Sequence, residues 1–240
     1  MARTTAAAAV VAAAILAATA GTAAAAPDCV NHAILYPAAC CNATAPAAFN
    51  VTFNTTVGQF TIGIQRAWSP YGVDRFYNLA VNHYFDSATE AGNDAGFFRV
   101  VPGFVVQFGI AGAPAVSGPW ENDIIPNDPV VLSNVRGTIA YAAAMSPAGQ
   151  AVNRTTQVYI NYGNNTNLDG DGFTPFGVIS EADMAVVDAI YAGYGQQPSQ
   201  DAIYREGDAY LQKKFPRLDY ITSTTVVVPP FPAAAAALRH

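Results

Sequence analysis

The chain has 240 residues, of which 52% are hydrophobic and 12% are charged. This composition excludes a disordered chain, and the length allows one large or two small domains with a sizeable buried core. The formal net charge is −6, from 11 Lys plus Arg and 17 Asp plus Glu. That sign is wrong for binding a phosphate backbone, so we expect no nucleic-acid partner. With three histidines and three cysteines, the chain poorly supplies metal sites and His-based triads, and we expect no metal.

Residues 1–26 have the pattern of a secretory signal peptide. A single early cation, Arg3, precedes an apolar run from Val10 to Leu16, and small residues follow. Ala-x-Ala patterns recur up to Ala26, so we predict cleavage between Ala20 and Ala26. The alternative is an uncleaved Ala-rich membrane anchor, but Thr and Gly interrupt this weakly apolar run. The sequence therefore predicts entry into the secretory pathway, with an extracellular, lumenal or periplasmic location after cleavage.

Residues 27–48 are predicted to be a Cys-containing linker. In an oxidising compartment Cys29 can close a small loop onto either Cys40 or Cys41, which leaves one spare thiol. A vicinal Cys40–Cys41 bridge or an intermolecular bridge is less favoured, and simple burial explains the spare thiol. Five sequons, which matter only in a eukaryote, fit the exported interpretation: Asn42, Asn50, Asn54, Asn153 and Asn164.

From residue 49 to residue 221 the sequence predicts one continuous domain. Two alternating apolar runs within residues 49–65 predict a β-hairpin. A capping Ser69 ahead of Pro70 predicts a helix over residues 70–84, Ser180 begins a second helix that ends by Gly193, and residues 209–215 favour a third. Short apolar strands are predicted at residues 96–101, 104–110, 137–143, 157–162 and 176–179. Closely spaced strands with few helices suggest a barrel.

The C-terminal residues differ in composition. Residues 226–237 read VVVPPFPAAAAA, in which the prolines cannot join a sheet interior and the alanines offer little apolar area. We therefore predict that these residues pack poorly, and we assign residues 222–240 to a Pro/Ala-rich tail.

The segment FFRVVPGFVVQ at residues 97–107 resembles the cyclophilins, which are peptidyl-prolyl cis-trans isomerases. Supporting segments match the family in order, at residues 136–142, 156–161, 167–170, 175–179 and 186–190. The resemblance implies a mainly β fold, a closed eight-stranded antiparallel barrel capped by two α-helices. Residues 207–220 are similar to a longer, bacterial-type branch with an additional C-terminal helical segment.

The chemistry that the resemblance implies needs no cofactor. Turning an X-Pro bond means breaking amide resonance against a barrier of about 18–20 kcal/mol, with no proton transfer or covalent intermediate. An apolar pocket for the proline ring, a donor to the prolyl nitrogen and polar anchors for the peptide all help. By resemblance Arg99 is the catalytic guanidinium, although a surface ion pair would also explain an isolated Arg. The expected substrate-binding residues, some of which could instead be barrel core, are Phe104, Val105, Gln107, Ala142, Ala143, Gln157, Tyr159 and Leu168.

Several positions depart from the better-known pattern of the family. Phe98 stands where His is usual, Ala143 replaces a frequent Asn, and Tyr159 replaces Phe and adds a hydroxyl that needs a partner. Because Asn167 lies near a position where the family often has Trp, we expect weakened binding of cyclosporin. The acidic motif at residues 165–170 resembles the start of a calcium loop, but its twelfth position is Phe176, so we interpret it as a turn.

The main hypothesis is an exported prolyl isomerase that assists folding. Its expected partners are proline-containing segments of unfolded or partly folded proteins, and we expect a monomer. The alternative is a noncatalytic peptide-binding or scaffold module that keeps the barrel and uses the cleft, or the Cys-containing N-terminal segment, for docking.

Overall fold

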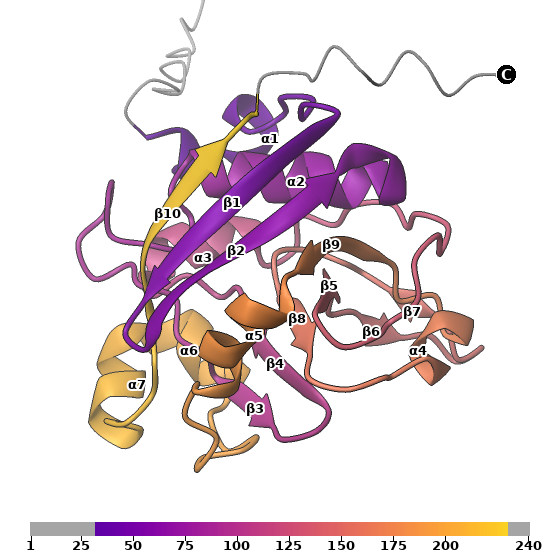
Figure 1. Ribbon diagram of the computed structural model, residues 1–240. Coiled ribbons are helices and arrows are strands. Elements are labelled where there is room, and N and C mark those ends of the chain that lie inside the picture. The colour runs from indigo at the N-terminus through magenta and orange to yellow at the C-terminus, as the bar shows by residue number, and fades with distance from the viewer. Residues whose placement is uncertain (1–31, 230–240) are drawn as a thin grey trace, which may run out of the picture.

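Eight antiparallel strands form one curled sheet in the computed structural model, which describes residues 32–229 (Figure 1). Their spatial order is β10-β1-β2-β9-β5-β8-β4-β3. The strands are β1 (Ala48–Thr55), β2 (Gly58–Gln65), β3 (Arg99–Val101), β4 (Val105–Phe108), β5 (Thr138–Tyr141), β8 (Val158–Asn161), β9 (Pro175–Ile179) and β10 (Ile221–Val227). A separate two-stranded ladder joins β6 (Ala144–Met145) to β7 (Ala151–Val152). The predicted mainly β fold is confirmed.

The two edges of the sheet, β10 and β3, meet through a short contact. An isolated antiparallel bridge pairs Gly96 with Tyr220, just before each strand begins. The Phe97 amide donates to the Asp219 carbonyl at 3.0 Å, and the Ile221 amide donates to the Ala95 carbonyl at 3.0 Å. The expected closed barrel is therefore a strongly curled sheet whose edges are joined at one bridge instead of along a full ladder.

Seven α-helices and two 3-10 turns flank the sheet within residues 32–229. They are η1 (Ala33–Leu35), α1 (Pro37–Cys40), η2 (Arg66–Trp68), α2 (Pro70–Val81), α3 (Pro114–Trp120), α4 (Asn167–Gly170), α5 (Glu181–Asp188), α6 (Gln200–Glu206) and α7 (Asp208–Lys214). In Figure 1, α2 passes behind the β1–β2 hairpin and α5 lies below β2, against which it packs, while α6 and α7 lie together at the lower left. The two capping helices and the additional C-terminal helical segment are as predicted.

The N-terminus of α2 is capped by a distant residue and not by Ser69. The Ser69 side chain makes no capping bond, because its hydroxyl donates to Asp128 Oδ2 at 2.6 Å. The same carboxylate accepts from the amides of Tyr71 and Gly72 at 3.1 and 3.0 Å, and it pairs with Arg154 at 2.9 Å. Burial alone would raise the pKa of Asp128, but these bonds outweigh it and hold the pKa below its usual range.

Two apolar clusters hold the molecule together, and a third lines one face of the sheet. The largest fills the curl of the sheet beneath α2 and α5 and includes Phe53, Phe76 and Phe108, none of which is exposed. The second lies under α6 and α7, where Phe98 packs with Ile203 and Leu211. This contact accounts for Phe98 at a position where the family usually has His, because the added helices cover that side chain.

The segment predicted to be a linker packs on the domain. Ile34 is buried in the main core, and its carbonyl accepts from the Trp120 indole at 2.7 Å. Cys40 is disulfide-bonded, whereas Cys41 is a free, buried thiol whose pKa burial raises to about 11. The spare thiol is therefore Cys41. The predicted signal peptide and Cys29 lie outside the described residues.

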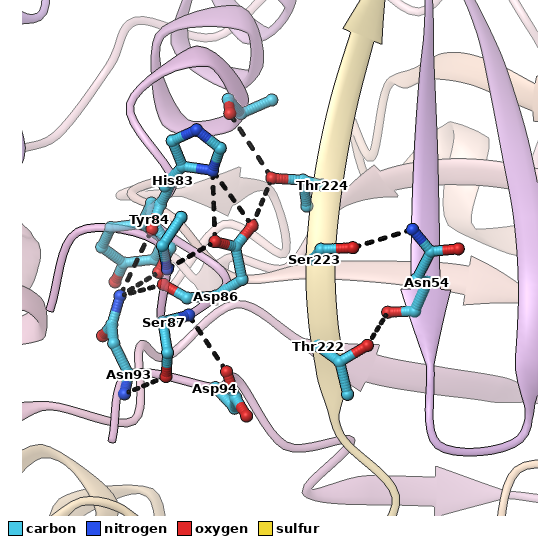
Figure 2. A network of polar contacts seen from close by, with 12 residues as sticks. Asn54, His83, Tyr84, Asp86, Ser87, Asn93, Asp94, Thr222, Ser223 and Thr224 are labelled. Carbon is cyan, nitrogen blue, oxygen red and sulfur yellow. Dashed lines mark hydrogen bonds and ion pairs between the residues drawn. The ribbon is translucent and has the colours of Figure 1, made fainter. Parts of the chain in front are cut away.

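The predicted tail begins inside a strand. The sequence places the domain boundary at residue 221, but β10 continues to Val227 and pairs with β1 over its length. Figure 2 shows polar contacts that fix it: the Thr224 hydroxyl donates to Asp86 Oδ2 at 2.6 Å, and Asn54 Nδ2 donates to the Ser223 hydroxyl at 2.7 Å. The boundary predicted at residue 222 is therefore wrong, because residues 222–227 belong to the sheet, and the predicted poor packing is wrong for residues 226 and 227.

Within residues 32–229 no helix has the length and apolar character needed to cross a membrane. The same residues hold no group of three or more His, Cys, Asp or Glu that could bind a metal ion. At the calcium-like motif, the oxygens of Asp169 already accept from Ser133 and Asn134, in keeping with a structural turn.

Candidate active site

One cleft of about 640 Å3 lies along β4, β8 and the end of β5, and it contains every sequence-predicted site residue. Its lining includes Arg99, Phe104, Val105, Gln107, Ala142, Ala143, Gln157, Tyr159 and Leu168. Pairing in the sheet explains why these residues meet. Arg99 stands opposite Gln107 across β3 and β4, and Gln107 stands opposite Tyr159 across β4 and β8. The β3–β4 turn contains Gly103 with a φ of +76°, a conformation that favours glycine.

Polar side chains form a continuous chain of hydrogen bonds along the cleft. Arg99 Nη1 donates to Gln107 Oε1 at 3.2 Å, and Gln107 Nε2 donates to Gln157 Oε1 at 2.8 Å. At the far end, Gln157 Nε2 donates to the Tyr204 hydroxyl at 3.4 Å. The chain fixes the orientation of both glutamine amides and leaves Arg99 donors facing the cleft.

Arg99 has no carboxylate partner among residues 32–229. The Arg99 Nε donates to Gln196 Oε1 at 2.8 Å, and the guanidinium carbon, Cζ, lies 5.7 Å from the centroid of the Phe104 ring. Partial burial lowers the pKa of Arg99 below the usual value for arginine, and the side chain is still a cation at neutral pH. Arg99 therefore does not form the surface ion pair that was the alternative explanation for this residue, because both of its side-chain acceptors are neutral amides.

Beside this chain lies a small apolar pocket. Val105, Ala140 and Tyr159 form a buried cluster against which Phe104, Ala142, Leu168 and Phe173 pack. The Tyr159 hydroxyl donates to Asn134 Oδ1 at 2.8 Å, so the added hydroxyl has its partner below the pocket. The pocket is separate from the main core, because β4, β5 and β8 are buried on both faces.

The opposite wall of the cleft comes from segments that the sequence analysis did not assign to the site. The end of α3 contributes Glu121 and Asn122, and α6 contributes Gln200, Asp201 and Tyr204. Neither helix carries a local signal for a cleft. Their residues reach it only because α6 packs on α3 and the second apolar cluster.

Comparison with known proteins decides the family. The sequence model described as "Cyclophilin type peptidyl-prolyl cis-trans isomerase/CLD" matches residues 50–206, more than half of the chain. The chain belongs to the cyclophilin family of peptidyl-prolyl cis-trans isomerases. The predicted family is thus confirmed, and with it the activity, isomerisation of X-Pro bonds.

Individual relatives agree with this cyclophilin assignment. A peptidyl-prolyl cis-trans isomerase of Acinetobacter baylyi is 27% identical over 148 residues, which is 58% of this chain and 70% of the relative. A peptidyl-prolyl cis-trans isomerase-like 1 protein of Emericella nidulans is 28% identical over 125 residues, or 51% and 70%. The crystal structure of a cyclophilin-type isomerase of Cryptosporidium parvum covers 76% of this chain and 99% of its own, with a TM-score of 0.50 and 16% identity. That likeness confirms the fold.

Proposed function

We propose that this cyclophilin isomerises X-Pro bonds in exported polypeptides, with Arg99 as the catalytic guanidinium. The observation that carries the assignment is that Arg99 opens onto the same cleft as a buried apolar pocket while its side-chain acceptors are neutral. A carboxylate partner would compete with the substrate for the guanidinium. Here the positive charge stays available to the peptide.

The geometry supports a mechanism that works by stabilising the twisted amide. The proline ring sits on Phe104, Val105, Tyr159 and Leu168, where burial of its apolar surface binds it. As the bond twists, the prolyl nitrogen loses its resonance and gains a lone pair, to which Arg99 donates. A donor that binds the twisted state more strongly than the planar state lowers the barrier.

The flanking peptide is held by neighbouring polar groups. Ala142 and Ala143 lie between β5 and β6. The Ala142 amide donates to the Gln157 carbonyl at 3.0 Å, which leaves the Ala142 carbonyl and the Ala143 main chain to pair with an extended peptide in the manner of an added strand. Gln107 and Gln157, oriented by each other, offer amide groups to the peptide backbone. The Asn that is frequent at position 143 is not needed for a main-chain contact.

The test is isomerisation of an Ala-Pro peptide, followed by NMR exchange, for the purified protein and for Arg99→Ala. We expect at least a hundredfold loss in kcat/KM, because the variant lacks the group that stabilises the twisted amide. Leu132→Ala, which lies outside the cleft lining, serves as the control. An Arg99→Ala protein with wild-type rates would refute the role of Arg99. A folded but inactive wild-type protein would instead favour the noncatalytic binding module.

Export is supported by two observations of different kinds. Residues 1–26 have the sequence pattern of a secretory signal peptide. Cys40 is disulfide-bonded, which is typical of proteins in oxidising compartments. Expression of the whole chain in a secreting host should yield a mature protein whose first residue lies between 21 and 26. Recovery of the uncleaved chain in the cytosol would overturn this part of the proposal.

We also propose weakened binding of cyclosporin, because of Asn167. Asn167 is exposed at the start of α4 and does not line the cleft, whereas the neighbouring Leu168 does. A large indole at position 167 would add apolar contact area that Asn cannot supply. We expect no inhibition at low nanomolar drug and stronger inhibition of Asn167→Trp. Low nanomolar inhibition of the wild-type protein would contradict this expectation.

A further inference from the structure

The loop between α5 and α6 places an acceptor directly on Arg99. Gln196 Oε1 accepts from Arg99 Nε at 2.8 Å, which is shorter than the 3.2 Å contact between Arg99 Nη1 and Gln107. The two acceptors lie on different nitrogens of one planar group. Together they fix the plane of the guanidinium, whereas with only one of them the guanidinium could still rotate about that hydrogen bond.

This loop is anchored on the strand that carries Arg99. The Val100 amide, next in the chain to Arg99, donates to the Gly195 carbonyl at 2.9 Å. Gly195 has a φ of +57°, and its amide donates to Ala192 at 3.0 Å. On the other side, the Gln197 amide donates to Tyr194 at 3.0 Å. The backbone on both sides of Gln196 is thus hydrogen-bonded, and its side chain begins from a fixed point.

The loop is also held by aromatic packing away from the cleft. The Tyr194 ring lies against Tyr191 and Phe215, with centroids 5.1 Å apart in each case. The Arg217 guanidinium covers Tyr191 at 4.1 Å from its centroid. The additional C-terminal segment therefore supports the loop, and through the loop it reaches Arg99.

We propose that Gln196 is a positioning residue for the isomerase reaction, and this inference rests on the proposed catalytic role of Arg99. An Arg side chain has several rotatable bonds, and holding it in one geometry before substrate binds avoids that ordering in the twisted state. Gln196 also leaves the positive charge intact, since its acceptor is a neutral amide. Without Gln196 the guanidinium keeps one acceptor and loses its fixed plane.

The test compares Gln196→Met, which keeps the length of the side chain and removes the acceptor, with the wild-type protein. One hydrogen bond to a charged group corresponds to a change of about tenfold. We expect kcat to fall about tenfold with KM unchanged, because the apolar pocket that binds the proline ring is intact. Gln197→Met is the matched control: Gln197 is exposed and lies outside the cleft lining, so its rates should match the wild type.

A double-mutant cycle separates this inference from the proposed function. If Gln196 acts through Arg99, adding Gln196→Met to Arg99→Ala causes no further loss. Additive losses, or a wild-type kcat in Gln196→Met while Arg99→Ala is inactive, overturn the role of Gln196 alone. Full activity of Arg99→Ala overturns the proposed catalytic role of Arg99, on which this inference rests. Because Gln196 is exposed, an unchanged thermal midpoint of Gln196→Met excludes misfolding as the cause of a loss.

Discussion

The Tyr159 hydroxyl is the one polar group that the pocket floor adds to an otherwise apolar surface. It donates to Asn134 Oδ1 at 2.8 Å, and burial raises its pKa, so it remains a neutral donor. The same Asn134 oxygen also accepts from Asn161 Nδ2 at 3.2 Å, so it would keep one hydrogen bond without the Tyr159 hydroxyl. We predict that Tyr159→Phe lowers the free energy of unfolding by about 0.5–1.5 kcal/mol and changes kcat/KM less than threefold. Urea denaturation and peptide exchange measure the two; a tenfold loss of activity would assign the hydroxyl to the substrate.

Asp208 makes stability depend on pH. It is 7% exposed, its Oδ1 has no hydrogen-bond partner among the described residues, and it lies near Asp94. Burial, followed by the charge of Asp94, raises its pKa from 3.8 to about 7. Between about pH 4 and pH 7 the unfolded state therefore releases a proton that the folded state retains. This contribution to stability is complete below pH 4 and is lost as pH rises through 7.

We predict that Asp208→Asn removes this dependence. At pH 4 the two proteins should unfold at similar urea concentrations, and at pH 8 the variant should be more stable by a few kcal/mol, at ~1.4 kcal/mol for each pKa unit. Glu206→Gln, exposed at the end of α6, should leave the wild-type profile unchanged. Parallel profiles for wild type and Asp208→Asn would show that the carboxyl ionises normally in the folded protein.

At the residue scale, the sequence could predict the site where its contacts are local in the sheet. Arg99 and Gln107 are eight positions apart and stand opposite each other across one turn, so a short motif carries both. Gln196 could not be predicted, because its contact with Arg99 spans 97 positions and depends on how the loop folds. No periodicity or spacing encodes such a contact. The cleft was therefore predictable along its strands and not along the α6 wall.

At the element scale, the strand β10 depends on a buried carboxylate. Asp86 is not exposed, and it accepts from Thr224 at 2.6 Å, from His83 at 3.1 Å and from the Ala88 amide at 3.0 Å (Figure 2). We predict that Thr224→Val, which keeps the shape and removes one donor, lowers the free energy of unfolding by about 1.5–3 kcal/mol. Thr225→Val, on the exposed face of the same strand, should change it by less than about 0.5 kcal/mol. Equal effects of the two in urea denaturation would mean that Asp86 does not anchor β10.

The helix α3 and the strand β10 were not predicted, because tertiary contacts override the local sequence there. The seven residues of α3 include Pro119 inside the helix and Gly118 beside it, a composition that disfavours helix. Burial of Val116 and Trp120, four positions apart on one face, stabilises it nonetheless. For β10, the prolines that begin at 229 suggested a tail, whereas pairing with β1 continues to Val227. In contrast, α5 was predictable because Ser180 caps it by accepting from Asp183.

At the scale of the whole molecule, the N-terminal segment completes the domain. Asn78 on α2 donates to the Ala43 carbonyl at 2.7 Å and accepts from its amide at 3.1 Å, while Asp74 accepts from Ala45. Ile34 is 2% exposed in the main core. Together with the Trp120 indole bond to the Ile34 carbonyl, these contacts join residues 34–45 to two helices, α2 and α3. The segment is therefore part of the folded unit, although its composition resembles a linker.

We predict that Ile34→Ala lowers the free energy of unfolding by about 2–5 kcal/mol, since it leaves a cavity in the main core. Ala38→Ser, exposed on α1, is the control and should have little effect. Because residues 32–47 line no part of the cleft, kcat/KM of Ile34→Ala should equal that of the wild type well below its thermal midpoint. If the segment were a separate linker, both variants would have the same free energy of unfolding as the wild type. A loss of stability with full activity would instead establish that it stabilises the domain without shaping the site.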